Sequence, residues 1–267
     1  MFKGVWMILA IDAGNSRTKW GVFDEAGELK THGAFLNAEL DKAATPVAWR
    51  SCERVVVSNV AGNEVKNLLQ RLLQPLAAPV RWASASAQAC GVKNGYATPQ
   101  HLGTDRWAAL VAAWQHYHAP CVVANAGTAL TIDALGFDTW DLDTESSIGI
   151  FLGGMILPGF SLMQHSLTHG TADVSARSQH EPQDSWQDFP THTHAALYTG
   201  ALSAMAGAVQ VMYSRLQQHE GKPPYCVLTG GDAALLADML QGDIAKHLVM
   251  ADNLVLQGLL LIEREIS

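Results

Sequence analysis

A polar turn lies between two apolar segments near the N-terminus, in ILAIDAGNSRTKWGVFD at residues 8–24. From Asp12 to Lys19 this turn gathers a carboxylate, an amide, a hydroxyl and two cations around one glycine. A β-hairpin needs only two turn residues, so the connection between two strands does not by itself explain these polar groups. One carboxylate together with phosphate oxygens is a typical Mg²⁺ environment, and glycine lets backbone amides approach a phosphate closely. The stretch therefore favours a metal–phosphate site; a carboxylate satisfied by turn amides is the plainer alternative.

A second copy of this plan begins at residue 121, where CVVANAGTALTIDAL again reads as strand, glycine turn and strand. Asp12 and Asn125 take equivalent places in the two copies. The repeat predicts two copies of one α/β unit, whose turns would face each other across a cleft. Glycine-bearing turns are expected after four strands, at residues 12–16, 125–129, 153–159 and 229–233. The sequence has neither a GxxxxGK[ST] loop nor a GxGxxG motif after a strand, which excludes a P-loop and disfavours a dinucleotide site. Four glycine turns in a duplicated α/β frame instead predict a nucleotide held from two sides.

A second acidic residue of interest, Asp105, stands in the segment LGTDRW. Thr104 and Asp105 could simply cap the helix expected after them. The adjacent Arg106 favours a further role, because an arginine anchor beside an acid suits an anionic substrate with a reactive hydroxyl. The two interpretations are compatible.

Strand and helix signals alternate along the chain and predict a mixed α/β fold. Helices are expected at residues 63–76, 106–117, 195–216 and 253–264, and strands at 54–60 and 79–85. In the helix at 106–117, the four large apolar residues have the spacing of a single buried face. They are Trp107, Leu110, Val111 and Trp114.

The helix expected at 195–216 carries small residues at Gly200, Ala204 and Gly207, which predict close packing against another helix. No apolar stretch approaches the roughly 20 residues of a membrane span. The apolar start at residues 1–12 lacks a signal-peptide cleavage site and is expected to be a buried strand. These observations predict a soluble, cytoplasmic protein.

The composition describes a compact globular protein, since 48% of the 267 residues are hydrophobic and 16% are charged. The net charge of −8 and the lack of a Lys/Arg cluster disfavour direct binding to nucleic acid. The four cysteines form no CxxC pair and indicate neither a zinc site nor a disulfide framework. Reduced thiols are typical of the cytosol.

Five motifs, in this order, carry a resemblance to a known family: DAGNS, Y..P..LGTDRW, NAGTALTID, GGMILPG and TGGDA. Together they resemble the type III pantothenate kinases, also called the Bvg accessory factor family, from residue 8 to about 260. The resemblance implies an α/β fold with two ribonuclease-H-like domains of the acetate kinase–Hsp70–actin superfamily and ATP in the cleft between them. The domains are expected at residues 1–118 and 119–267. It also implies a homodimer that phosphorylates pantothenate at its primary hydroxyl to 4'-phosphopantothenate, the first step of coenzyme A biosynthesis.

The same resemblance implies a role for each motif. Asp105 would be the general base, and Asp12 would lie near Mg²⁺. The ATP phosphates would bind to two loops. The first phosphate loop consists of Asp12, Ala13, Gly14, Asn15, Ser16, Arg17, Thr18 and Lys19, and the second phosphate loop contributes Thr128. Pantothenate would meet Tyr96, Gly103, Thr104, Asp105, Arg106 and Thr193 of the partner subunit. Residues 229–233 would form the turn on the adenosine side.

The chain departs from the family pattern in two places. Asn125 stands where the family usually has an aspartate that holds a monovalent cation, K⁺ or NH₄⁺. An amide oxygen can coordinate such a cation but supplies no charge. Residues 171–175, TADVS, replace the usual TAxLP and predict an altered substrate lid.

Two other functions stay open at this point. One is a kinase of the same superfamily for another small hydroxyl substrate, such as a sugar. The other is a regulatory accessory protein of the same fold, which binds nucleotide or a protein partner with little turnover.

Overall fold

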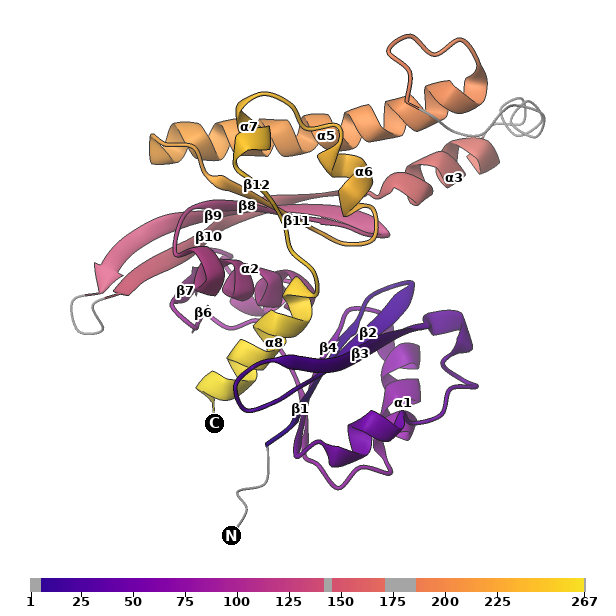
Figure 1. Ribbon diagram of the computed structural model, residues 1–267, viewed down its shortest axis with the longest axis vertical. Helices are drawn as coiled ribbons and strands as arrows, with labels where there is room; N and C mark the ends of the chain where they lie inside the picture. Colours follow the sequence, from indigo (N-terminus) through magenta and orange to yellow (C-terminus); the bar gives the residue numbers. More distant parts are fainter. Residues whose placement is uncertain (1–5, 142–145, 171–185, 267) are drawn as a thin grey trace. The chain divides into compact units, whose positions relative to one another are not determined.

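The computed structural model describes residues 6–141, 146–170 and 186–266 (Figure 1). The chain divides into two compact units, one of Met1–His118, Asp138–Phe151 and Asn253–Ser267, the other of Ala119–Phe137 and Leu152–Asp252. The division expected from the sequence also falls after residue 118, but two later segments group with the first unit. The domains 1–118 and 119–267 therefore stay a prediction. The expected lid change at 171–175 lies outside the described residues.

The first unit is built on a five-stranded sheet in the order β3-β2-β1-β4-β5. Its strands are β1 (Ile8–Ala13), β2 (Arg17–Phe23), β3 (Leu29–Leu36), β4 (Arg54–Asn59) and β5 (Val80–Trp82). β1 to β3 are antiparallel neighbours, whereas β4 and β5 run parallel to β1. β1 reads as a nearly continuous apolar run because it lies in the middle of the sheet and is covered on both faces. The strands predicted at 54–60 and 79–85 are confirmed.

Among the described residues of the first unit, three α-helices match helices predicted from the sequence. They are α1 (Gly62–Leu73), α2 (Thr104–Tyr117) and α8 (Leu254–Glu265). The connections contain the 3₁₀ turns η1 (Asn37–Glu39), η2 (Val47–Ser51) and η3 (Pro99–His101), and the short strands β6 (Gln88–Ala89) and β7 (Val92–Asn94). The elements that carry the N-terminal motifs therefore form as expected.

α2 is buried all round, whereas the sequence predicted a single buried face. Every residue from Arg106 to Trp114 is buried. On one side α2 packs against α8, where a Cβ on Gly258 would overlap the carbonyl oxygen of Ala108. On another side, a Cβ on Gly149 would lie 2.6 Å from the Trp114 ring. The many alanines of α2 permit this close approach, and the helix that begins at the Asp105 motif is thereby fixed on more than one side.

The second unit repeats the strand order of the first. Its strands are β8 (Cys121–Ala126), β9 (Ala129–Asp141), β10 (Ser146–Pro158), β11 (Tyr225–Thr229) and β12 (Leu248–Met250). They lie in the order β10-β9-β8-β11-β12, which matches β3-β2-β1-β4-β5. β8 pairs antiparallel with β9 and parallel with β11, as β1 does with β2 and β4. The internal repeat predicted from the sequence is therefore confirmed. The far ends of β9 and β10 belong to the first unit, where β10 pairs with β7.

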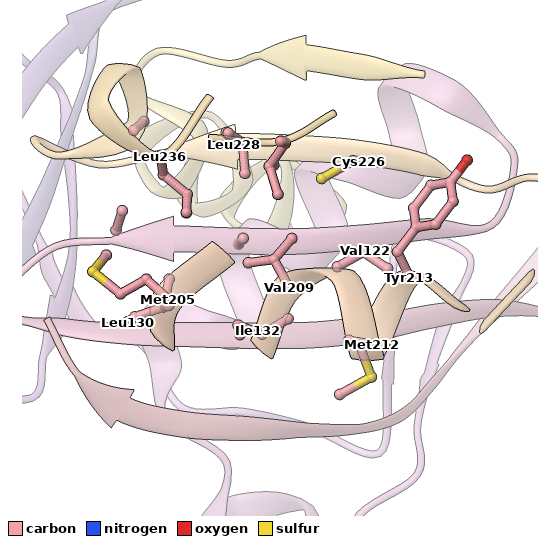
Figure 2. Close-up of a cluster of buried hydrophobic side chains, with 14 of the residues drawn as sticks. Val122, Leu130, Ile132, Met205, Val209, Met212, Tyr213, Cys226, Leu228 and Leu236 are labelled. Carbon is pink, nitrogen blue, oxygen red and sulfur yellow. The ribbon is translucent and has the colours of Figure 1, made fainter. Parts of the chain in front are cut away.

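The core of the second unit forms between its sheet and the long helix α5 (Thr193–Glu220). Side chains of α5, including Met205 and Val209, point toward Val122 of β8 and Ile132 of β9 (Figure 2). The shorter helices are α3 (Phe160–Gly170), α6 (Ala233–Ala237) and α7 (Asp243–Lys246). α5 confirms the long helix predicted at 195–216.

α5 differs from two expectations. It is long and apolar enough to cross a membrane by length and composition alone, the one such helix in the described part of the chain, although no segment was expected to qualify. Its place in the core of the second unit accounts for that composition. Gly200, Ala204 and Gly207 are exposed, and a Cβ on either glycine would meet nothing within 4 Å. The close helix packing predicted there is not found among the described residues.

Residues 153–158 form the end of β10, not the glycine turn that the sequence predicted. Two glycines and a proline suggested a break in regular structure, but pairing within the sheet overrides such local preferences. Only Gly159 separates β10 from α3. The turn of this motif is thus a single residue long.

We expect Gly258→Ala to lower the free energy of unfolding by about 1–3 kcal/mol, as is typical of an overpacked core. The added Cβ would overlap the Ala108 carbonyl. Gly207→Ala is the matched control, because it adds the same methyl group to a helix at an open position. It should be neutral or stabilise the protein by up to ~1 kcal/mol. Urea denaturation compares the two variants, and equal midpoints would contradict the packing of α2 on α8.

Candidate functional site

Asp12 lies one residue before the end of β1, beside Ser58 of β4 and Lys19 of β2. Burial raises the pKa of Asp12 to about 7, the Asp105 carboxylate adds to the rise, and Lys19 opposes it. The Oδ1 atom of Asp12 is buried and has no hydrogen-bond partner among the described residues. A buried carboxylate oxygen without a donor is unfavourable. The side chain therefore fits a cation ligand better than a carboxylate satisfied by turn amides.

Asp105 lies in the first turn of α2, after Gly103. Its Oδ1 accepts a hydrogen bond from the N–H of Arg106 at 2.8 Å, but the N-cap of α2 is Gly103 and no side chain caps the helix. Burial raises the pKa of Asp105, although the N–H and the guanidinium of Arg106 oppose the rise. A Cβ on Gly103 would lie 2.6 Å from Asp105 Oδ1, so a glycine makes room for the carboxylate at the start of the helix.

A serine that the sequence analysis missed ties the helix start to the sheet. Ser58 Oγ and Thr104 Oγ1 lie 2.6 Å apart and share a hydrogen bond, and Ser58 is fully buried. Ser58 is also the register neighbour of Asp12 on the adjacent parallel strand. The sequence signal for Ser58 is a polar residue near the end of an otherwise apolar strand. The hydrogen bond of Ser58 fixes the start of α2, and therefore Asp105, next to the end of β1.

Arg106 packs beside two aromatic rings that also pack on each other. Its Nη1 donates to the Tyr96 hydroxyl at 3.1 Å, and its guanidinium carbon lies 5.9 Å from the Tyr96 ring centre and 5.7 Å from that of Phe151. The two rings pack with their centres 5.3 Å apart. Arg106 is 7% exposed. The structure thus brings Tyr96 and Arg106 together, as expected, and adds Phe151, which no motif identified.

The loop after β1 forms the predicted hairpin with β2. Gly14 N–H donates to Arg17 O at 3.1 Å and closes the turn. Arg17 and Lys19 are exposed, whereas Thr18 between them is fully buried. This alternation follows the two faces of a strand and places both cations on the face opposite Thr18.

Three glycine turns of the second unit pack backbone against backbone. Gly159 N–H donates to Thr128 O at 2.9 Å, and a Cβ on Gly159 would overlap the carbonyl of Gly127. Gly230 has a φ of +102°, and its Cβ would overlap the carbonyl of Ala126. The turns after β8, β10 and β11 therefore gather at one place. Glycine is required at Gly159 and Gly230 because no larger residue fits.

The remaining predicted residues of the second unit have simple positions. Asn125 lies one residue before the end of β8, beside Thr229 of β11 and opposite Thr131 of β9. Thr128 is exposed at the tip of its turn, and Thr193 begins α5. These residues lie in the second unit, whereas Asp12, Tyr96 and Asp105 lie in the first. A cleft between the two sets stays a prediction.

Asp12→Asn should change how the stability of the ligand-free protein depends on pH. The pKa of Asp12 is raised from 3.8 to about 7. At pH values between these two, which form the relevant window, Asp12 is protonated in the folded chain and ionised in the unfolded chain. The free energy of unfolding should therefore fall as the pH rises through the window, by up to about 1.4 kcal/mol per pH unit from this group. Asparagine does not ionise, so the variant should lose this slope and be more stable than the wild type at pH 8.

Thermal unfolding between pH 4.5 and 8 checks this expectation. Asp41→Asn is the control, since Asp41 is an exposed aspartate of the same unit. Parallel pH profiles for the wild type and Asp12→Asn would show that the buried carboxylate does not titrate as described.

Two solved structures share the fold. A candidate 2-dehydro-3-deoxygalactonokinase from Sinorhizobium meliloti is 12% identical, has a TM-score of 0.56, and is matched over 97% of this chain and 99% of that one. The ethanolamine utilization protein EutJ from Carboxydothermus hydrogenoformans is 10% identical, with a TM-score of 0.53 and coverage of 96% and 89%. At such identities the likeness concerns the fold alone. It agrees with the expected α/β fold, which is thereby confirmed, while membership of the acetate kinase–Hsp70–actin superfamily stays an expectation.

Sequence relatives match along nearly the whole chain. The type III pantothenate kinase of Methylobacillus flagellatus is 45% identical over 259 residues, 96% of this chain and 98% of that protein. The type III pantothenate kinase of Nitrosospira multiformis is 41% identical over 264 residues, with coverage of 98% and 92%. A family model described as type III pantothenate kinase matches residues 8–215. The chain therefore belongs to the type III pantothenate kinase family.

Proposed function

We propose that this protein phosphorylates pantothenate with ATP to give 4'-phosphopantothenate, the first step of coenzyme A biosynthesis. Membership of the family supports the reaction. The observation that carries the proposal is the pair of desolvated carboxylates in the first unit, Asp12 and Asp105, of which Asp105 adds to the raised pKa of Asp12. Such a pair, with Arg106 beside it, suits the transfer of a phosphoryl group to the hydroxyl of an anionic substrate.

Asp105 is the proposed general base. As the primary hydroxyl of pantothenate attacks the γ-phosphorus, its proton passes to the Asp105 carboxylate, a new P–O bond forms, and the bond to the β-phosphate oxygen breaks to release ADP. Burial raises the pKa of Asp105 and so makes it a stronger base than an exposed aspartate. General-base assistance of this kind contributes about 10²–10⁴-fold to rate.

Asp12 is the residue that would hold Mg²⁺, because its buried Oδ1 has no donor among the described residues. Bound Mg²⁺ neutralises phosphate charge, and it typically needs one or two carboxylates together with waters and phosphates. The loop from Ala13 to Lys19 and the turn at Thr128 would receive the phosphates. Phosphoryl transfer depends mainly on such positioning and charge neutralisation.

Pantothenate would bind beside the start of α2. The Arg106 guanidinium and the Tyr96 hydroxyl are already oriented by their mutual hydrogen bond and by Phe151. They would recognise the carboxylate of the substrate, while Gly103 and Thr104 line its path to Asp105. An arginine held in this way loses little freedom on binding.

Further parts of the proposal concern assembly and location. The protein would act as a homodimer, with Thr193 of the partner subunit contributing to the pantothenate site, and residues 229–233 would contact adenosine. All four cysteines are free thiols, which supports a cytoplasmic location. The alternative of an accessory protein with little turnover is not favoured, because the relatives are named as kinases.

Asp105→Asn should lower kcat by about 10²-fold or more while ATP binding stays within about twofold of the wild type. Asparagine keeps the size and the hydrogen-bond acceptor but cannot take up the hydroxyl proton. A coupled assay for ADP release measures kcat, and calorimetry measures ATP affinity. Asp41→Asn again serves as the control. Unchanged turnover in Asp105→Asn would remove Asp105 from its proposed role.

The response to monovalent cations should reveal what Asn125 can do. We expect K⁺ or NH₄⁺ to support more activity than Na⁺, with a lower K⁺ concentration needed in Asn125→Asp, because a carboxylate adds the charge that the amide lacks. Initial rates in matched K⁺, NH₄⁺ and Na⁺ buffers with Mg²⁺ provide the measurement. Equal rates in all three for both proteins would argue against a cation site. A folded wild-type protein with no activity in any buffer would instead support the accessory role.

A further inference from the structure

We propose that Asn37 is a positioning residue that holds the phosphate loop after β1 in the shape that receives the ATP phosphates. The inference rests on the proposed function. Asn37 is the first residue of η1 and directly follows β3. It lies 19 to 23 residues from the loop atoms it contacts and belongs to none of the sequence motifs.

Asn37 makes four hydrogen bonds to this loop. Its Nδ2 donates to the carbonyl oxygens of Gly14 at 2.7 Å and Asn15 at 3.0 Å. Its backbone N–H donates to Ser16 O at 3.0 Å. The Thr18 hydroxyl donates to Asn37 Oδ1 at 2.9 Å. A single residue thus contacts four of the five positions from Gly14 to Thr18.

Anchoring the carbonyl groups also orients the amides. A trans peptide unit is planar, and its N–H points opposite to its C=O; the described residues contain no cis peptide bond. Because Gly14 O and Asn15 O face Asn37, the N–H groups of the same two peptide units point away from it. Successive amides on one side of a turn form a nest for anions. Asn37 therefore fixes the loop with these amides directed toward an incoming phosphate.

The contacts require an amide side chain, which offers two donor hydrogens and an acceptor in one plane. Thr18 is fully buried, and its hydroxyl donates to Oδ1, which leaves Nδ2 facing the loop carbonyls. Thr18 thus acts on the loop through Asn37, although the sequence placed it among the residues that bind ATP directly. An aspartate at position 37 would have the same shape but would set a carboxylate oxygen against two carbonyl oxygens.

Asn37→Asp tests the proposal in the full-length protein, and Asn67→Asp is the control. Asn67 is an exposed residue of α1 in the same unit, so its variant makes the same change in charge on a solvent-exposed surface. Calorimetry measures the binding of a non-hydrolysable Mg·ATP analogue and, separately, of adenosine. We expect Asn37→Asp to bind the analogue about tenfold more weakly than Asn67→Asp, because the half-buried amide donor is lost. Adenosine carries no phosphate, so its affinity should stay within about twofold.

Thr18→Val is a second variant, because it keeps the side-chain shape and removes only the donor to Asn37 Oδ1. It should weaken analogue binding by about threefold, again without an effect on adenosine. If thermal unfolding shows that Asn37→Asp does not fold, Thr18→Val carries the test. Equal analogue affinity in the variants and the control, or an equal loss for analogue and adenosine, would overturn the role of Asn37.

These measurements need no turnover, so they separate the two hypotheses. A wild-type protein that binds the analogue but does not phosphorylate pantothenate would refute the proposed function alone. A wild-type protein that phosphorylates pantothenate, with no selective loss in either loop variant, would refute the Asn37 inference alone.

Discussion

The desolvation of Asp12 and Asp105 is the constraint on which the first unit depends. Burial raises the pKa of both carboxylates, and the nearby Asp105 carboxylate adds to the rise of Asp12, whose pKa reaches about 7. Asp12 Oδ1 has no donor in the described part of the chain to offset this effect. The arrangement persists because rigid elements impose it. β1 is held inside a sheet by strands on both sides, and α2 is buried from Arg106 to Trp114. The fold thus maintains two buried carboxylates whose charge Lys19 and Arg106 offset only in part.

The two units use the same strand order for different chemistry. In the first, the hairpin of β1 and β2 presents a carboxylate, Asp12, with Ser58 beside it. In the second, the equivalent strand β8 carries Asn125 at the matching position, with Thr229 beside it. There the close contacts are between backbones, at Gly159 and Gly230. Backbone groups carry no net charge but can approach a phosphate closely. The duplicated frame therefore provides an acidic site in one unit and a glycine-lined one in the other.

Local features could be predicted from the sequence, and features that depend on distant partners could not. Both strand–turn–strand repeats and the helix after Asp105 follow from residues close in the chain. Ser58, by contrast, becomes meaningful only through Thr104, 46 residues away. The end of β10 was predicted as a turn because its glycines favour one locally, yet neighbouring strands make it part of a sheet. α2 was expected to bury one face because periodicity cannot show how many elements will cover a helix, and its four alanines let other elements approach closely.

The residues that the motifs do not include share one physical role. Ser58 and Asn37 both come from segments next to the β1–β2 hairpin, and each forms hydrogen bonds to an element that carries proposed site residues. A hairpin turn is intrinsically mobile, whereas phosphoryl transfer requires groups held within about 0.5 Å of their working positions. The turn DAGNS supplies the groups that would contact phosphate, but its own residues cannot provide that rigidity. Neighbouring strands supply it, and so the precision of the site is a property of the sheet and not of the motif.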